Sequence, residues 1–135
     1  KTWITPHSKE FGRLFPNIKS KTNIGLARDA AKEFNISILL KGANSIVADS
    51  KKVWQLFGTD SQTARAGLGD LLCGFIAGSS AIDLTLCRNI STDFFAKYVL
   101  LHSFAASKCK SGSNASAIGD ELAKLMRNIK TRQIS

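Results

Sequence analysis

Residues 36–44 read Ile-Ser-Ile-Leu-Leu-Lys-Gly-Ala-Asn, an apolar run that stops at a lysine-glycine turn. A continuous apolar run with one small residue is typical of a parallel strand that is buried on both faces. Open α/β sheets bind ligands outside the carboxyl ends of such strands, so Lys41 and Gly42 are well placed to contact a nucleotide phosphate. Lysine-glycine pairs also occur in ordinary turns, and this turn alone decides no function.

The segments around this run alternate between strand and helix patterns. Apolar and β-prone runs predict strands at residues 2–5, 36–40, 45–48 and 53–57, the last two joined as a hairpin. Helical spacing predicts helices at residues 7–15, 23–34, 71–82, 91–106 and 117–129, with Ser8 as the N-cap of the first. The almost wholly apolar helix at 71–82 suggests burial on several sides. The order predicts an α/β layered fold with its site at strand ends.

Composition places the chain among ordinary globular domains. Its 135 residues are 44% hydrophobic and 21% charged, enough for one domain with a core. No apolar run approaches the roughly 20 residues of a membrane span, and no secretory signal is present. Cys73, Cys87 and Cys109 are odd in number and widely spaced, which favours neither disulfides nor a metal site. The chain is therefore expected in the cytoplasm, with Cys73 as a small core residue.

The net charge of +9 comes from 19 basic and 10 acidic residues. The lysines and arginines are scattered along the chain, without a single stripe or interleaved aromatic residues. This pattern favours a basic surface around a site for anionic nucleotides over a nucleic-acid-binding module.

A glycine turn precedes the apolar helix, in the run Ala66-Gly67-Leu68-Gly69-Asp70. Glycines permit unusual dihedrals and close approach of a ligand, and a helix N-terminus offers unpaired N–H groups to phosphate oxygens. A carboxylate beside such a cradle repels phosphate, so it is out of place at a site that only binds anions. Its presence makes sense if it takes a proton from a hydroxyl that attacks the phosphorus. Asp70 is thus a candidate general base. The alternative is an acidic first-turn residue after an ordinary turn.

A third polar cluster, Thr5-Pro6-His7-Ser8-Lys9-Glu10, follows the first predicted strand. His7 and Glu10 lie one helical turn apart and could face one cavity. The alternative is a surface histidine and a capping-box acid that faces Ser8 or His7. If the strands at 2–5 and 36–40 are neighbours, their clusters open on the same rim. His102, which has no acid near it in sequence, reads as a structural or surface histidine.

Three motifs together resemble the NAD(P)H-hydrate dehydratases of the ribokinase-like superfamily. They are Thr5-Pro6-His7-x-x-Glu10-Phe11, Leu40-Lys41-Gly42-Ala43 and Ala64-x-Ala66-Gly67-Leu68-Gly69-Asp70-Leu71-Leu72-x-Gly74. The resemblance implies a three-layer α/β/α sandwich, with residues 1–135 forming one partial domain, the C-terminal half. It also implies repair of hydrated NADH or NADPH: ADP or ATP phosphorylates the ring hydroxyl, and phosphate then leaves.

The resemblance also implies roles for individual residues. Asp70 is the base and, with His7, contacts the hydrate. The adenine nucleotide is contacted by Lys41, Gly42, Ala43, Asn44, Ser45 and Gly69, and the transferred phosphate by Gly67, Leu68 and Gly69. Leu68 stands where bacterial members often have threonine, so its contribution is through the backbone. Mg²⁺ is the expected ion; its ligands are unknown, with Glu10 as a candidate.

Other functions fit parts of the same pattern. A ribokinase-like kinase for a sugar or vitamin alcohol would use Asp70 in the same role. A non-catalytic basic module would bind nucleotide or nucleic acid without need of Asp70. A membrane partner is not expected. Because half of the resembled domain is absent, the chain is expected either to form a homo-oligomer or to pair with a missing N-terminal half.

Overall fold

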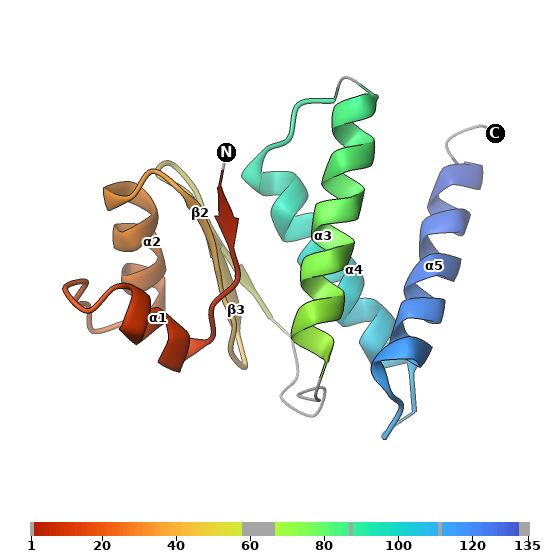
Figure 1. Ribbon diagram of the computed structural model, residues 1–135, viewed down its shortest axis with the longest axis horizontal. Coiled ribbons are helices and arrows are strands. Elements are labelled where there is room, and N and C mark those ends of the chain that lie inside the picture. The colour runs from red at the N-terminus through yellow and green to blue at the C-terminus, as the bar shows by residue number, and fades with distance from the viewer. Residues whose placement is uncertain (1, 58–66, 87, 111, 133–135) are drawn as a thin grey trace. The chain divides into compact units, whose positions relative to one another are not determined.

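The computed structural model describes residues 2–57, 67–86, 88–110 and 112–132. The elements are β1 (Trp3–Ile4), α1 (Ser8–Leu14), α2 (Asn23–Glu33), β2 (Ser37–Leu40), β3 (Ser45–Ala48), β4 (Val53–Leu56), α3 (Leu68–Thr85), α4 (Thr92–Lys108) and α5 (Ala115–Arg132) (Figure 1). Every helix and strand expected from the sequence is present within a few residues of its expected bounds. The expected loop at 58–65, Ala66 and Cys87 lie outside the described residues.

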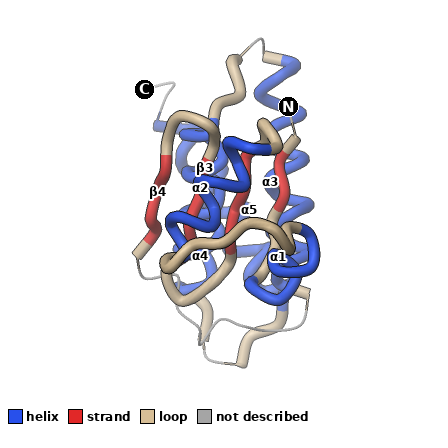
Figure 2. The backbone as a smooth tube through the Cα atoms, turned by 90° about the vertical axis from the view of Figure 1, so that its left-hand side faces the viewer, coloured by secondary structure: helices blue, strands red, loops and turns tan. Residues whose placement is uncertain are grey.

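The four strands form one sheet in the order β1-β2-β3-β4, whose strands Figure 2 shows in red. β1 pairs parallel with β2, and β2, β3 and β4 pair antiparallel in succession. All four residues of β2 are buried, as the apolar run predicts. Helices α1 and α2 lie on one face of this sheet (Figure 1). The carboxyl ends of β1 and β2 therefore lie side by side, as expected for a shared rim.

The core under α1 and α2 explains why these segments are helical. Apolar side chains recur every three or four residues on each helix, and they pack on the apolar side chains of β2 and β3. The cluster contains Phe11, Phe15, Ile18, Ala27, Ala30, Ala31, Ile38, Leu40, Ile46 and Ala48. The helix before β2 ends where Asn35 takes a positive φ of 51°, a conformation that asparagine tolerates.

The chain divides into two compact units. The first comprises residues 1–59 and 91–96, and the second residues 60–90 and 97–135. Within the first unit the start of α4 is held by polar and aromatic contacts. Thr92 donates a hydrogen bond to the Asp49 carboxylate, and Asp93 accepts from Lys52 and from the Trp54 indole.

A buried carboxylate organises the second unit. Asp83, 6% exposed on α3, accepts a hydrogen bond from the Tyr98 hydroxyl and pairs with the Arg88 guanidinium at 3.0 Å. A buried carboxylate requires such partners because an unpaired one is costly. Burial raises the pKa of Tyr98, and the hydrogen bond to Asp83 raises it further. The phenol therefore stays protonated wherever the unit is folded.

Two expectations about α3 are wrong. Only 28% of this helix is buried, and Ile82, Leu84 and Leu86 are each more than half exposed. The described residues supply packing partners for one side of α3, the side of Leu68, Leu72, Ile76 and Asp83. Cys73 lies next to that side and is exposed, so it is not a core residue.

Helix α3 is also the one helix among the described residues that is long and apolar enough, by length and composition, to cross a membrane. This is weak evidence, because core helices of globular proteins have the same composition. Asp70 and Asp83 bound its uninterrupted apolar part, residues 71–82. Those residues span about 18 Å at the helical rise, short of the roughly 30 Å of hydrocarbon in a bilayer.

Candidate functional site

A first candidate site, in the first unit, lies where β1 and β2 end. The Lys41 N–H donates to the Pro6 carbonyl at 2.9 Å, and His7 and Lys41 form a parallel β-bridge. The parallel pairing of β1 with β2 is thus resumed beyond both strands, where His7 lies three residues after Ile4 and Lys41 directly follows Leu40. It brings two of the predicted site segments, residues 5–10 and 41–45, together on one rim.

His7 begins helix α1, and the expected N-cap at Ser8 is wrong. His7 has extended dihedrals (φ −83°, ψ 171°), and its Nδ1 accepts the Glu10 N–H at 3.1 Å. In return the His7 N–H donates to Glu10 Oε2 at 2.7 Å, which completes a capping box. The histidine replaces serine as the cap because its ring nitrogen reaches the same free N–H. The capping-box alternative for Glu10 is confirmed, and the substrate role of His7 stays a prediction.

The Glu10 carboxylate is surrounded by donors and cations. Its Oε1 lies 3.5 Å from His7 Nε2, and its Oε2 lies 3.8 Å from Lys41 Nζ. The hydrogen bond from the His7 N–H lowers the pKa of Glu10, partial burial acts in the opposite direction, and the charges of Lys41, His7 and Arg13 lower the pKa further. These partners favour the ionised form of the carboxylate, which already forms contacts with other groups of the protein. The proposed metal role of Glu10 stays untested.

The lowered pKa of Glu10 predicts a pH-dependent contribution to stability. A carboxyl whose pKa is lower in the folded state stabilises the fold above its unfolded pKa, here 4.5, and loses that contribution as pH falls through the folded value. Glu10→Gln should therefore cost stability at neutral pH and progressively less below pH 4.5. Urea midpoints of both proteins from pH 7 to about pH 3 measure this difference. A gap that stays constant over this range would contradict the assignment.

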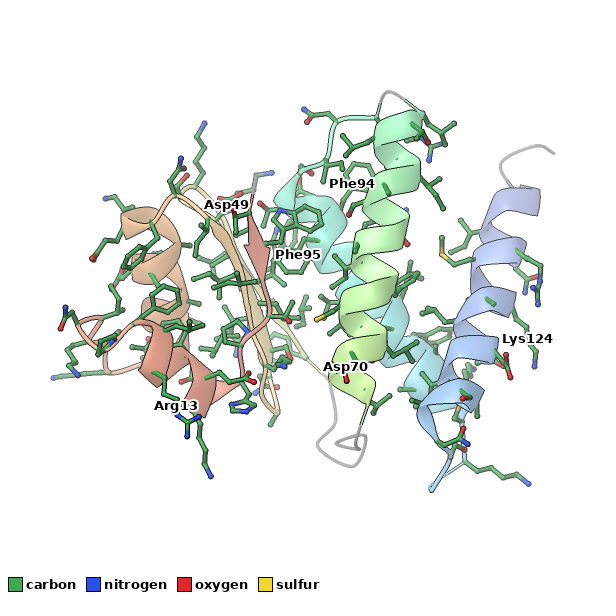
Figure 3. The ribbon with its side chains drawn as sticks, viewed as in Figure 1. Arg13, Asp49, Asp70, Phe94, Phe95 and Lys124 are labelled. Carbon is green, nitrogen blue, oxygen red and sulfur yellow. The ribbon has the colours of Figure 1, made fainter. Side chains whose placement is uncertain are left out.

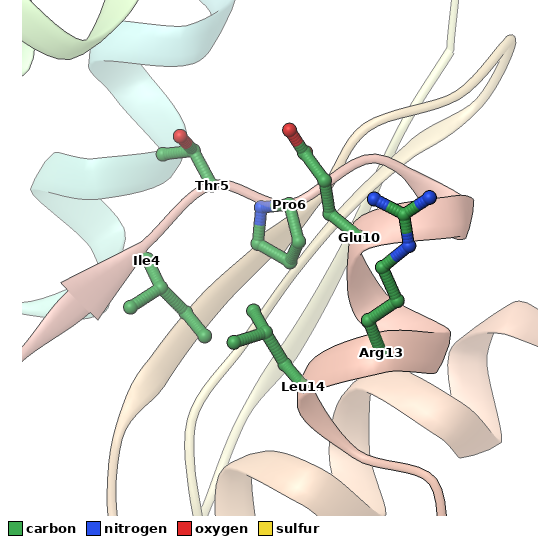
Figure 4. A pocket seen from close by; sticks show the side chains of 6 residues that line it. All are labelled: Ile4, Thr5, Pro6, Glu10, Arg13 and Leu14. Atoms are coloured by element: carbon green, nitrogen blue, oxygen red, sulfur yellow. The ribbon is translucent and has the colours of Figure 1, made fainter.

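An open hollow of about 410 Å³ adjoins this cap (Figure 4). Its lining is Ile4, Thr5, Pro6, Glu10, Arg13 and Leu14. Arg13 and Leu14 are absent from the predicted site. Arg13 follows Glu10 by one helical turn, so helical spacing alone would have placed both on one face of α1. The hollow therefore joins the end of β1 to a charged face of α1.

The Lys41–Ser45 segment forms the turn between β2 and β3. Ser45 is buried, and its hydroxyl donates to the Gly42 carbonyl at 3.2 Å. Gly42, Ala43 and Asn44 are exposed, and the Lys41 side chain is 29% exposed. The hydrogen bond of Ser45 thus stabilises the turn from inside, and Gly42, Ala43 and Asn44 lie on its outer side. The backbone there permits close approach of a ligand, as predicted for the nucleotide.

A second candidate site is the glycine turn, in the second unit. Gly67 is the N-cap of α3 in a left-handed conformation (φ +82°), without a side-chain cap. The N–H groups of Leu68, Gly69 and Asp70 have no acceptor within the helix, because they precede its first hydrogen bond. Asp70 lies on this first turn (Figure 3), is exposed, and has no partner in the described part of the chain. The turn therefore offers three donors and one uncommitted carboxylate.

The side chain of Leu68 does not take part in this surface. It is 7% exposed and packs with Ala105, Ala106, Ile118 and Leu122 in the core of the second unit. The leucine thus anchors the start of α3 to α4 and α5. Any contact of Leu68 with an anion must come from its backbone, as expected at this position.

Alanine substitutions at two glycines of this region are expected to change the free energy of unfolding in opposite directions. Gly67→Ala should lower the free energy of unfolding by about 1–2 kcal/mol, because a Cβ disfavours positive φ. Gly74→Ala, in the middle of α3 with open space around it, should raise that energy by about 0.5–1 kcal/mol. Urea unfolding of both variants tests the turn. Equal signs would show that Gly67 does not hold the left-handed conformation.

Comparison with known proteins matches nearly the whole chain to one family. The family model for NAD(P)H-hydrate dehydratase matches residues 1–130. A bifunctional NAD(P)H-hydrate repair enzyme of Gloeobacter violaceus is 45% identical over 89 residues, covering 65% of this chain and 17% of that protein. An ADP-dependent (S)-NAD(P)H-hydrate dehydratase of Nitrosopumilus maritimus is 36% identical over 78 residues, covering 56% and 27%.

A solved structure of the same family also matches the fold. The crystal structure of an ADP/ATP-dependent NAD(P)H-hydrate dehydratase of Bacillus subtilis, co-crystallised with ATP and Mg²⁺, matches with a TM-score of 0.70 at 20% identity. The match covers 93% of this chain and 47% of that one. The chain therefore spans about half of the structure that it matches, and less of the curated relatives. The expected ribokinase-like α/β fold is confirmed, and the expectation that residues 1–135 form one partial domain, the C-terminal half, stays a prediction.

Proposed function

This chain belongs to the NAD(P)H-hydrate dehydratase family, and we propose that it serves ADP- or ATP-dependent dehydration of hydrated NADH or NADPH. The observation that carries the proposal is the first turn of α3. There Gly67 leaves three backbone N–H groups at a helix N-terminus beside the uncommitted carboxylate of Asp70. An anion cradle with an adjacent base is the arrangement that phosphoryl transfer to a hydroxyl requires.

The chemistry assigns one task to each group. The oxygen of the ring hydroxyl attacks the terminal phosphorus of the nucleotide while Asp70 accepts the hydroxyl proton. The bond from that phosphorus to the bridging oxygen breaks, which releases AMP from ADP or ADP from ATP. The N–H groups of Leu68 and Gly69 stabilise the charge on the transferring phosphoryl oxygens. Loss of phosphate, with loss of a ring proton, then restores the double bond.

The first unit supplies the contacts that hold the reactants. The outward backbone of the turn from Lys41 to Ser45 suits an adenine nucleotide, and the Lys41 ammonium suits its phosphates. His7, at the end of the neighbouring strand, is assigned to the hydrate. Both reactants are polyanions, which accounts for the basic balance of the chain.

Magnesium fits this chain as an ion that arrives with the nucleotide. Among the described residues no group of three or more histidine, cysteine or acidic side chains gathers around one point. Mg²⁺ is commonly held by one or two carboxylates together with substrate phosphates and water. The ion would neutralise phosphate charge during transfer.

The test is turnover of hydrated NADH and NADPH by the protein expressed with the full coding sequence around these residues, and by the 135-residue chain alone. Restoration of the dihydronicotinamide absorbance with ADP or ATP, and none without nucleotide, is expected. A panel of sugar and vitamin alcohols serves as the competing substrate set. Phosphorylation of one of these alcohols without repair of the hydrate would instead establish a kinase.

A further inference from the structure

Phe57 is an exposed aromatic residue that directly follows β4 in the first unit. Its side chain is 73% exposed, whereas Leu56, the last residue of β4, is buried. The Phe57 ring therefore takes no part in the core, and it gains the free energy of burial only when a ligand or partner covers it. Single exposed apolar side chains are common on proteins, so the position of this ring carries the argument.

The strand register places Phe57 at the same end of the sheet as the turn between β2 and β3. β2 and β3 pair antiparallel, with Leu40 opposite Ile46. β3 and β4 also pair antiparallel, with Ser45 opposite Leu56. The end of β2, the beginning of β3 and the end of β4 therefore lie together. Phe57, one residue beyond Leu56, stands beside the turn that is assigned to the nucleotide.

The chemical character of this rim changes along the order of the strands, β1-β2-β3-β4. His7 and Lys41 follow β1 and β2, and the Glu10 carboxylate lies 3.8 Å from Lys41 Nζ. Phe57 follows β4, two strand positions from Lys41, which is about 10 Å at the usual strand spacing. Ionic groups thus lie toward one side of the rim and an aromatic ring toward the other, with the exposed turn between them.

We propose that Phe57 is a nucleotide-binding residue whose ring stacks on the adenine base of the co-substrate. A nucleoside diphosphate or triphosphate has anionic phosphates at one end and a flat aromatic base at the other. This is the order of groups on the rim from Lys41 to Phe57. An ammonium group suits the phosphates, and an aromatic ring suits the face of a base. The inference rests on the proposed function for the assignment of the nucleotide to this turn.

Titration with ADP and ATP in the absence of hydrate tests the stacking, with the protein expressed from its full coding sequence. Phe57→Ala should raise Kd for both nucleotides by about 5- to 150-fold, the usual contribution of one base–aromatic stack. Phe57→Trp keeps an aromatic face and should bind both nucleotides about as tightly as wild type. Inorganic tripolyphosphate, which has no base, should bind equally to wild type and to Phe57→Ala.

Phe34→Ala is the matched control. Phe34 is 50% exposed in the same unit, and it precedes Ser37, the first residue of β2, whereas Lys41 follows the last residue of that strand. The control removes the same ring near the opposite end of β2 and should leave Kd for ADP unchanged. Because Phe57 is largely exposed, its replacement by alanine opens no core cavity. Circular dichroism of each variant checks that the fold is retained.

Nuclear magnetic resonance gives a readout that a merely structural role of Phe57 would not move. In the ADP complex of wild type, the ring protons of adenine should show nuclear Overhauser contacts with the ring protons of Phe57. Stacking should also move the adenine proton signals upfield. Both signs should be lost in the complex of Phe57→Ala and the upfield shift should return with Phe57→Trp.

The outcomes distinguish this inference from the proposed function. Unchanged Kd for ADP in Phe57→Ala overturns the stacking, as does an equal loss of tripolyphosphate binding or a wild type that binds no adenine nucleotide. If Phe57→Ala weakens ADP binding while wild type repairs no hydrate, the proposed dehydration fails and the stacking stands. If wild type repairs the hydrate and Phe57→Ala does so with unchanged KM for ADP, the proposed function stands and the stacking fails.

Discussion

Asp70→Asn is expected to reduce turnover of hydrated NADH by about 10²–10⁴-fold, the usual contribution of a positioned general base. Asparagine has nearly the same size and keeps the helix start, but it cannot accept the hydroxyl proton. The adenine nucleotide should still bind, since its predicted contacts are backbone groups and Lys41. Steady-state kinetics and nucleotide titration on the same preparation measure both effects.

The matched control is Asp120→Asn, an exposed acid on α5 in the same unit. It makes the same change of charge at a residue outside the glycine turn and should leave both quantities unchanged. Turnover near wild type in the Asp70→Asn protein would remove Asp70 from the base role. Loss of nucleotide binding together with turnover would instead indicate that Asp70 acts through binding of the nucleotide and its ion.

Local patterns in the sequence predict the elements and part of the site well. The apolar run before Lys41 is the buried strand β2, and its parallel pairing with β1 brings His7 and Lys41 together. These features can be predicted because the burial of a strand and the position of its end depend on a few adjacent residues. The left-handed glycine at position 67 follows from the same local logic, since a turn needs a residue without Cβ.

The features that the sequence does not reveal depend on partners far along the chain. Burial of α3 on several sides is a reasonable expectation for its composition, but the described residues cover one side of it. The cap of α1 is the His7 ring, whose Nδ1 accepts the Glu10 N–H in place of a cap at the expected Ser8. No sequence motif marks Asp83. Its structural role comes from the hydrogen bond that it accepts from Tyr98, 15 residues away. Long-range contacts of this kind produce no periodic pattern in the sequence.

Three acids of this chain now differ in what they can do. Asp83 is buried and committed to Tyr98 and Arg88, and Glu10 is committed to His7 and Lys41. Asp70 is exposed and uncommitted within the described residues, at the one helix start that has no side-chain cap among α1, α2 and α3. A first-turn carboxylate also stabilises a helix through the helix dipole without any side-chain partner, so the base role of Asp70 stays a prediction.

Phe95→Ala is expected to lower the free energy of unfolding by about 3–5 kcal/mol, the cost of a large cavity in a core. Phe95 is fully buried, and its ring stacks on Trp3 with 4.6 Å between centroids (Figure 3). Urea unfolding followed by far-ultraviolet circular dichroism measures the loss. Phe104→Ala is the matched control, since this phenylalanine of the same helix is 48% exposed and contacts Lys108. It should cost less than about 1 kcal/mol.

The effect of Phe95→Ala should extend to the site because of where Trp3 lies. β1 has two residues, Trp3 and Ile4, and it is held by its pairing with β2 and by the stack of Trp3 on Phe95. Without that stack, the strand that leads to His7 loses one of its anchors. The amide hydrogen of Lys41, which donates to the Pro6 carbonyl just after β1, should then exchange with solvent faster in the folded variant. An unchanged exchange rate would show that the remaining contacts of β1 are sufficient to hold its end in place.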